Sequence, residues 1–134
     1  MRSSARRGLR HDAGGSATVE FALAVPVLIL FFCGIAASTL ALFVQNSVKD
    51  AVSVGARHAT LSPTPTTSEV IAKVKSASQT DLTGTGSSVT VTAGTDSSGR
   101  SYYTITASRV YQFPLYPFTN RTVTLSATKR AYTG

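Results

Sequence analysis

The sequence is poor in the residues that build disulfide bonds, metal sites and catalytic centres. It has one cysteine, Cys33, two histidines and no tryptophan in 134 residues. A single cysteine excludes an intramolecular disulfide and a metal site of several thiolates, and His11 and His58 are too far apart in the sequence to indicate a metal-binding pair. No phosphate-binding glycine loop, nucleophile elbow or zinc-ligand spacing is present. We therefore expect no catalytic residue, no metal site and no cofactor, and we interpret the protein as one that is not an enzyme.

Acidic residues are also scarce. The chain has six Asp and Glu against thirteen Lys and Arg, which gives a formal net charge of +7. A basic protein that binds nucleic acid usually gathers its positive charge on one face. Beyond the amino-terminal arginines the basic residues are scattered, apart from the neighbours Lys129 and Arg130. We therefore expect no nucleic-acid partner.

Charge is absent altogether from Phe21 to Val48, and the most apolar part of this run, 21–44, is the predicted membrane span. At ~1.5 Å per residue, a helix of this length crosses a hydrocarbon layer of ~30 Å. The arginines before the run place the amino terminus in the cytoplasm by the positive-inside rule, so the carboxyl-terminal part lies outside. Pro26 removes one backbone hydrogen bond and is expected to kink the helix locally. The sequence thus predicts a single-pass protein of the cytoplasmic membrane.

Two other interpretations of the apolar run stay open. A secretory signal peptide also has a basic start and an apolar region, and Ala36-Ala37-Ser38 has the small residues of a cleavage site. Cleavage there would, however, leave the apolar stretch 39–44 at the start of a soluble protein. An uncleaved signal anchor is the other interpretation.

The helix is predicted to continue beyond the membrane. Apolar or small residues recur at three- and four-residue steps from Val44 to Ala59, with polar residues on the other side. Ser62-Pro63-Thr64-Pro65 ends the helix, because proline disfavours the helical conformation in the residue before it.

Small residues at four-residue spacing allow helices to approach closely. They either pack on helices of other subunits or fit under the chain's own small domain, and the sequence leaves both interpretations open. These predicted helix-packing residues are Gly34 and Ser38 within the span, and Ser47, Ala51, Gly55 and Ala59 beyond it.

A short helix and about three strands are predicted after Leu61. Thr66 and Glu69 have the spacing of a capping box, and an apolar stripe follows to about Ala77. The pattern then alternates, with a turn at 96–99. The apolar face of this sheet is expected to pack on both helices. Its residues are Val89, Val91, Ala93, Tyr103, Ile105, Ala107, Tyr111, Phe113, Val123, Leu125, Ala127 and Ala131.

The predicted fold is therefore α+β: a long amino-terminal transmembrane helix that continues outside the membrane, a short helix, and a small antiparallel sheet of about three strands. Three parts are expected along the chain. They are a basic leader at 1–15, which is cleaved, the long helix at 16–61 with its span at about 21–44, and a small extracytoplasmic head at 62–134.

The junction between leader and helix carries a resemblance. Gly15 is followed by four spacer residues, then Glu20 and Phe21, directly before the apolar run. This pattern resembles the processing site of type IV prepilin-like proteins. Together with 22–28, Gln45-Asn46 and the segment 51–59 (AVSVGARHA), it resembles the TadE family, the TadE/TadG-like pseudopilins of the tight-adherence pilus. The resemblance covers roughly residues 14–59.

The resemblance implies cleavage between Gly15 and Ser16 by a membrane prepilin peptidase, with Glu20 at the fifth position of the mature protein. It also implies a minor pilin or pseudopilin that acts in assembly of a type IVc-like pilus. The implied partners are the peptidase, other pilin-like subunits and the pilus assembly platform. Classical type IV pilins usually begin with Phe after the cut, whereas Ser16 stands here, so methylation of the new amino terminus does not carry over.

Glu20 suggests a mechanism. A carboxylate at the edge of a membrane helix is costly to hold. After cleavage behind Gly15, the new amino terminus of one subunit can neutralise Glu20 of a neighbour. The alternative function is an uncleaved, signal-anchored surface protein that acts as an adhesin or as a binding module of an envelope complex. The mass of the mature protein distinguishes the two.

Overall fold

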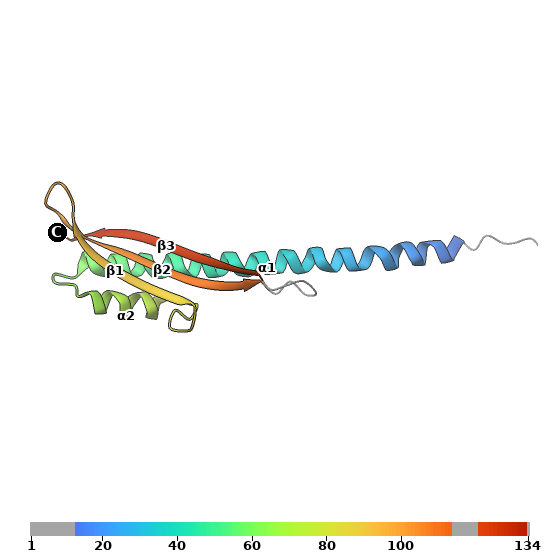
Figure 1. The fold of residues 1–134 in the computed structure, drawn as a ribbon, viewed down its shortest axis with the longest axis horizontal. Helices are drawn as coiled ribbons and strands as arrows, with labels where there is room; N and C mark the ends of the chain where they lie inside the picture. Colours follow the sequence, from blue (N-terminus) through green and yellow to red (C-terminus); the bar gives the residue numbers. More distant parts are fainter. Residues whose placement is uncertain (1–12, 114–120, 134) are drawn as a thin grey trace, which may run out of the picture. The chain divides into compact units, whose positions relative to one another are not determined.

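The computed structural model describes residues 13–113 and 121–133, so most of the predicted leader, 1–12, lies outside the described residues. It has the predicted α+β architecture: a long helix, a short helix and a three-stranded antiparallel sheet (Figure 1). The elements are α1 (Ala13–Leu61), α2 (Thr67–Ala77), β1 (Ser87–Thr95), β2 (Ser101–Phe113) and β3 (Arg121–Tyr132).

The chain forms two compact units, and the division falls within α1, between Ile35 and Ala36. The first unit is described from Ala13 and consists of the amino-terminal part of α1. The second unit contains the rest of α1, α2 and the whole sheet. The helical residues after Ala36 therefore belong to the same compact body as the strands.

Helix α1 is assigned as one helix through Pro26 and ends at Leu61. The end falls where the sequence predicts it, just before Ser62 and the two following prolines. Ser62 N–H still donates to His58 O at 3.0 Å, which satisfies a carbonyl of the last turn.

Helix α2 begins with the predicted capping box. Glu69 N–H donates to Thr66 Oγ1 at 3.3 Å, and Thr66 N–H donates to Glu69 Oε2 at 3.1 Å. These reciprocal bonds satisfy two donors that a helix start otherwise leaves unpaired. The side of α2 that carries Val70 and Val74 is fully buried, whereas Lys73 and Lys75 are exposed.

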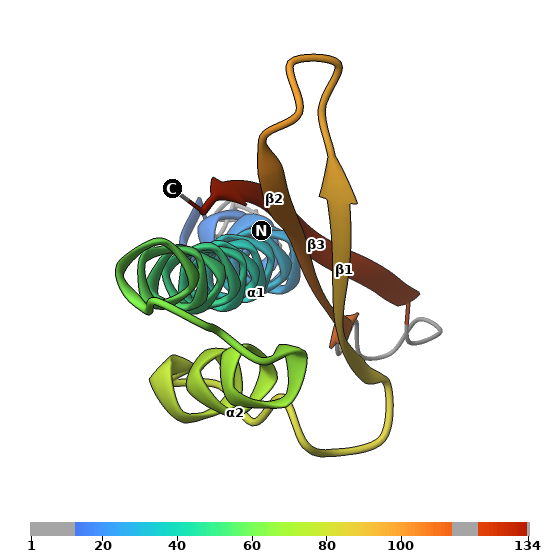
Figure 2. The ribbon, with the colours of Figure 1, turned by 90° about the vertical axis from the view of Figure 1, so that its left-hand side faces the viewer.

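The sheet is a meander in the order β1-β2-β3. Ile105 at its centre lies opposite Val91 on β1 and opposite Lys129 on β3. The turn between β1 and β2 is the predicted one at 96–99, and Gly99 has the positive φ of 84° that this turn requires. Figure 2 shows α2 and the neighbouring part of α1 on the same side of the sheet, while neither of the described helices lies against its other side.

The core of the second unit lies between the two helices and the sheet, as the apolar pattern predicts. Its largest fully buried side chains are Val48 and Val52 of α1, Val70 and Val74 of α2, and Ile105 of β2. The edge strands are less covered than the central strand. Two residues expected on the apolar face, Ala93 and Val123, lie on these edge strands and are exposed.

Candidate functional site

The first unit is a helix that is apolar on every side. Phe21 and Leu23 lie on nearly opposite sides of the axis, and both are exposed, at 69% and 72%. A helix of this kind is stable only in an apolar environment. By length and composition, α1 from Ala17 to Leu61 is long and apolar enough to cross a membrane. We conclude that α1 is suited to anchor the protein as a single pass.

The predicted processing junction lies at the start of this helix. Gly15 is exposed, and a Cβ atom at this position would meet no other atom within 4 Å. Packing within the unit therefore does not require glycine here. The backbone of Ser16 lies four residues before Glu20, which is a rise of ~6 Å, or about one helical turn.

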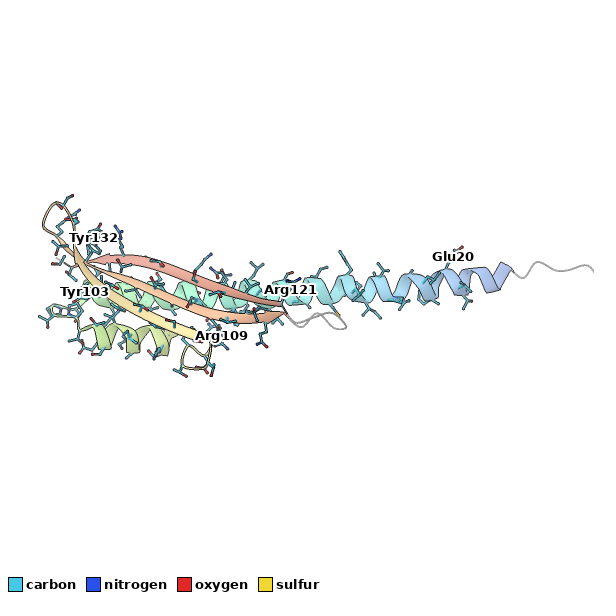
Figure 3. All side chains as sticks on the ribbon, viewed as in Figure 1. Glu20, Tyr103, Arg109, Arg121 and Tyr132 are labelled. Atoms are coloured by element: carbon cyan, nitrogen blue, oxygen red, sulfur yellow. The ribbon has the colours of Figure 1, made fainter. Side chains whose placement is uncertain are left out.

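Glu20 is exposed on the first unit, and its side chain points away from the helix axis (Figure 3). Residues 13–113 and 121–133 contain one ion pair, between Arg100 and Asp96 at 3.2 Å. Glu20 therefore has no ion-pair partner in the described part of its own chain. An exposed carboxylate among exposed apolar side chains is expensive in a membrane. The geometry leaves this carboxylate available to a partner from another molecule.

The small residues of the second unit lie inside its core. Ser47, Ala51, Gly55 and Ala59 are all buried. A Cβ atom on Gly55 would overlap Val74 Cγ2, so the glycine allows α1 and α2 to approach closely. Of the two interpretations of this ladder, the structure supports the one in which it fits under the chain's own domain.

The other small pair behaves differently. Gly34 is half-buried, and a Cβ atom on it would meet no other atom within 4 Å. Ser38 is exposed. These two positions are accessible to a neighbouring helix.

Ser47 has a further role that the sequence pattern did not indicate. Its Oγ lies 3.3 Å from Ser78 Oγ and accepts a hydrogen bond from Thr80 N–H at 3.2 Å. This buried hydroxyl therefore ties α1 to the segment that follows α2. A serine in a ladder of alanine and glycine is the signal that could have indicated a buried polar contact.

Two polar side chains join α1 to β3. Gln45 Nε2 donates to Ser126 O at 3.0 Å, and Lys129 Nζ donates to Ser53 Oγ at 2.9 Å. The bond of Lys129 could have been expected from the sequence, because the alternation of β3 puts Lys129 on the apolar face, next to Ala127 and Ala131. A lysine on that face needs a polar partner, and Ser53 provides one.

Three carboxylates of the second unit, those of Glu69, Asp81 and Asp96, are each held by hydrogen bonds to nearby residues. The backbone N–H of Thr66 lowers the pKa of Glu69, the Thr83 hydroxyl lowers the pKa of Asp81, and the Ser98 hydroxyl lowers the pKa of Asp96. A carboxylate with a lowered pKa is a poor general base near neutral pH. In the described residues, no three His, Cys, Asp or Glu side chains gather where they could hold a metal ion.

Comparison with known families matches one part of the chain. Residues 15–57 fit the model of a family described as TadE-like protein. The matched segment includes the Gly15–Glu20 junction, the apolar run and the small residues up to Gly55, whereas α2 and the sheet lie outside it. Neither the curated proteins nor the solved structures give a match. Over residues 15–57, about a third of its length, the chain is thus similar to the TadE-like family, as the resemblance in its residues predicts.

Proposed function

We propose that this protein is a minor pilin or pseudopilin that acts in the assembly of a tight-adherence pilus. The observation that carries the proposal is the TadE-like match over 15–57, which begins at Gly15 and includes Glu20 at the start of an apolar helix. The TadE-like family suggests involvement in this pilus. Assembly through a shared helix also needs no catalytic group, and we propose a structural protein without cofactor rather than an enzyme.

Processing is the first step of the proposed function. A prepilin peptidase cleaves between Gly15 and Ser16 on the cytoplasmic side and removes the leader at 1–15. The exposure of Gly15 supports this step, because a peptidase must reach the backbone there. The remaining helix then holds the protein in the membrane, with residues 62–134 outside.

The extent of the span follows from burial. Most apolar side chains from Val19 to Phe43 are exposed, whereas Val44 and Val48 are buried in the second unit. The exposed part must be covered by lipid or by other subunits. This supports a span at about 21–44 and a continuation of α1 that belongs to the external body.

Assembly is the second step. The amino terminus created at Ser16 is positive, and Glu20 of a neighbouring subunit is negative. Pairing between subunits neutralises both in a medium where an unpaired carboxylate costs roughly a few kcal/mol. Because the pair forms only between molecules, it favours insertion of one subunit beside another.

The decisive experiment is the intact mass of the full-length protein produced with and without a prepilin peptidase. We expect the peptidase to remove residues 1–15. Gly15→Val should block removal, because it changes the residue before the cut. A Cβ atom at this position meets no other atom within 4 Å, so we expect the helix itself to be undisturbed. Gly34→Val is a matched control within the same helix and should be processed normally. An intact amino terminus in the presence of active peptidase would instead support the uncleaved surface anchor.

A further inference from the structure

One end of the sheet lies beside the outer end of the predicted span. Gln45 Nε2 donates to Ser126 O at 3.0 Å, and Lys129 Nζ donates to Ser53 Oγ at 2.9 Å. Between these two contacts β3 advances by three residues, or ~10 Å, and α1 advances by eight, or ~12 Å. The two elements therefore run in the same direction, and the residues of β3 before Ser126 lie on the membrane side of Gln45.

Two residues of β3 extend furthest toward the membrane. Val123 lies three residues before the contact with Gln45, which corresponds to ~10 Å of strand. The same distance along α1 leads from Gln45 back to about Ser38, inside the predicted span. Arg121 lies two residues further along β3. The burial of Ala37, which belongs to the same compact unit as the sheet, shows that this unit still covers one side of α1 at this level.

This part of α1 reaches the outer edge of the membrane. The predicted span at 21–44 is ~36 Å long, whereas the hydrocarbon layer is ~30 Å thick and each headgroup layer adds ~5–8 Å. Leu40 and Phe43 are exposed on α1 and need apolar surroundings. The last turns of the span therefore pass into the outer headgroup layer, and the end of the sheet beside them lies at that depth.

The side chains at this end of the sheet suit a membrane interface. Val110 and Val123 are apolar and are 38% and 42% exposed. Arg121 is exposed on the same face of β3 as Val123 and takes part in no ion pair among the residues that the structure describes. The aliphatic part of an arginine can lie along apolar surface while its guanidinium reaches a phosphate.

The two arginines at this end differ in their surroundings. Figure 3 shows Arg109 and Arg121 at one end of the sheet and Tyr132 at the other. Arg109 is half-buried and acts on Asp81, whose pKa is lowered mainly by hydrogen bonds from Thr83 and in addition by the charge of Arg109. Arg121 is the more exposed of the two, so it is the better candidate for a contact with lipid.

We propose that this end of the sheet docks on the membrane surface, where Arg121 contacts the phosphate groups of anionic phospholipids and Val123 enters the apolar edge of the layer. Docking continues the lipid contact of α1, because the same helix carries the sheet and holds it at the bilayer. Anionic lipid attracts a basic residue near the surface. Docking requires α1 to span a membrane, as proposed, but requires neither cleavage nor pilus assembly.

The test measures depth in the full-length protein, reconstituted at one copy per nanodisc so that lipid is the only partner present. The discs contain phosphatidylcholine with or without phosphatidylglycerol. Cys33→Ser removes the one native thiol, and Val123→Cys then carries an environment-sensitive fluorophore. Ser97→Cys, in the exposed turn at the opposite end of the sheet, is the matched control. Leu30→Cys reports whether α1 spans the bilayer.

Quenching is measured with lipids that carry a nitroxide on the headgroup or deep in the acyl chain. We expect the headgroup nitroxide to quench the label at position 123 and to leave the label at position 97 unquenched, because the two lie ~30 Å apart along the sheet. Arg121→Glu should shift the ratio of docked to undocked protein by at least roughly fivefold in the anionic discs, which corresponds to ~1 kcal/mol per basic residue near such a surface. Arg130→Glu, the same change at the other end of β3, should not shift it.

The outcomes separate docking from anchoring. Quenching at position 30 from the acyl chain without quenching at position 123 would overturn docking and leave the anchor intact. No quenching at position 30 would overturn the anchor and docking with it. Equal quenching at positions 123 and 97, or an equal effect of Arg121→Glu and Arg130→Glu, would overturn the proposed contact. If circular dichroism shows that Val123→Cys does not fold, Thr124→Cys, exposed on the other face of β3, replaces it with the same expected results.

Discussion

Val74 of α2 lies directly against Gly55 of α1, so that a Cβ atom on Gly55 would overlap Val74 Cγ2 and would lie 3.7 Å from Val70 O. Both valines are fully buried. The contact brings the two helices together over the core, and the absence of a side chain at one position makes it possible.

Gly55→Ala should therefore destabilise the second unit. Overpacking a dense core costs about 1–3 kcal/mol, which exceeds the roughly 1 kcal/mol that alanine gains over glycine in a helix. Thermal unfolding followed by circular dichroism should show a lower Tm. Gly34→Ala is the matched control, because its Cβ would meet no atom within 4 Å. A Tm for Gly55→Ala at or above that of the control would contradict the close approach of α1 and α2.

Ser47→Ala should loosen the segment after α2. It removes the contact with Ser78 Oγ and the bond from Thr80 N–H, although Thr80 N–H keeps a 3.2 Å bond to Ser78 Oγ. The expected loss is about 0.5–1.5 kcal/mol. Hydrogen exchange at Thr80 should be faster in the variant. Ser76→Ala, on the exposed side of α2, is the control, and equal exchange in both variants would argue against the tie.

Local and long-range features of the fold differ in how well the sequence predicts them. The capping box of Thr66 and Glu69 is local, so its spacing alone predicts the start of α2, and the alternation of β2 predicts its buried face. The sequence does not predict what the ladder from Ser47 to Ala59 packs against. Close packing on a neighbouring subunit and close packing on α2 would both favour small residues there.

The basic side chains between α1 and β3 show what the sequence could not predict about the protein surface. Arg57 and Lys129 are far apart in the sequence, and only the packing of β3 beside α1 brings them to one surface. The basic residues are scattered along the sequence, so the sequence predicts no clustered basic patch. Beyond the leader, only Lys129 and Arg130 are neighbours in the sequence. Because side chains alternate along β3, Lys129 points toward α1, whereas Arg130 points to the opposite face of the sheet and lies over Tyr102.

Acid should destabilise the turn between β1 and β2. The Asp96 carboxylate accepts hydrogen bonds from Ser98 Oγ at 2.6 Å and from Arg100 N–H at 3.0 Å, which lower its pKa below the ordinary value of 3.8. The folded state therefore binds a proton less readily than the unfolded state. The resulting stabilisation is fully present above pH 3.8 and is lost as the pH falls through the lowered pKa.

This prediction is checked by thermal unfolding between pH 2 and 6, on the wild type and on Asp96→Asn. The wild type should lose more of its Tm on acidification than the variant, because asparagine cannot be protonated in this range. Asp81 and Glu69 are retained in both proteins, so their lowered pKa values contribute equally. Identical pH profiles would show that the Asp96 hydrogen bonds do not contribute to stability.

Glu20 offers the sharpest test of the assembly mechanism, because it has no ion-pair partner among the described residues of its own chain and has no packing role to confuse the result. Glu20→Ala should leave cleavage after Gly15 largely intact and should reduce incorporation into the pilus, since the new amino terminus of the adjacent subunit loses its counter-charge. Glu20→Gln keeps the size and polarity and removes the charge, so it should fail in the same way, whereas Glu20→Asp should retain part of the incorporation. Intact mass reports cleavage, and immunoblotting of sheared surface fibres against the membrane fraction reports incorporation. Normal incorporation of Glu20→Gln would exclude charge pairing, because then a neutral side chain suffices for the neighbouring helix to insert.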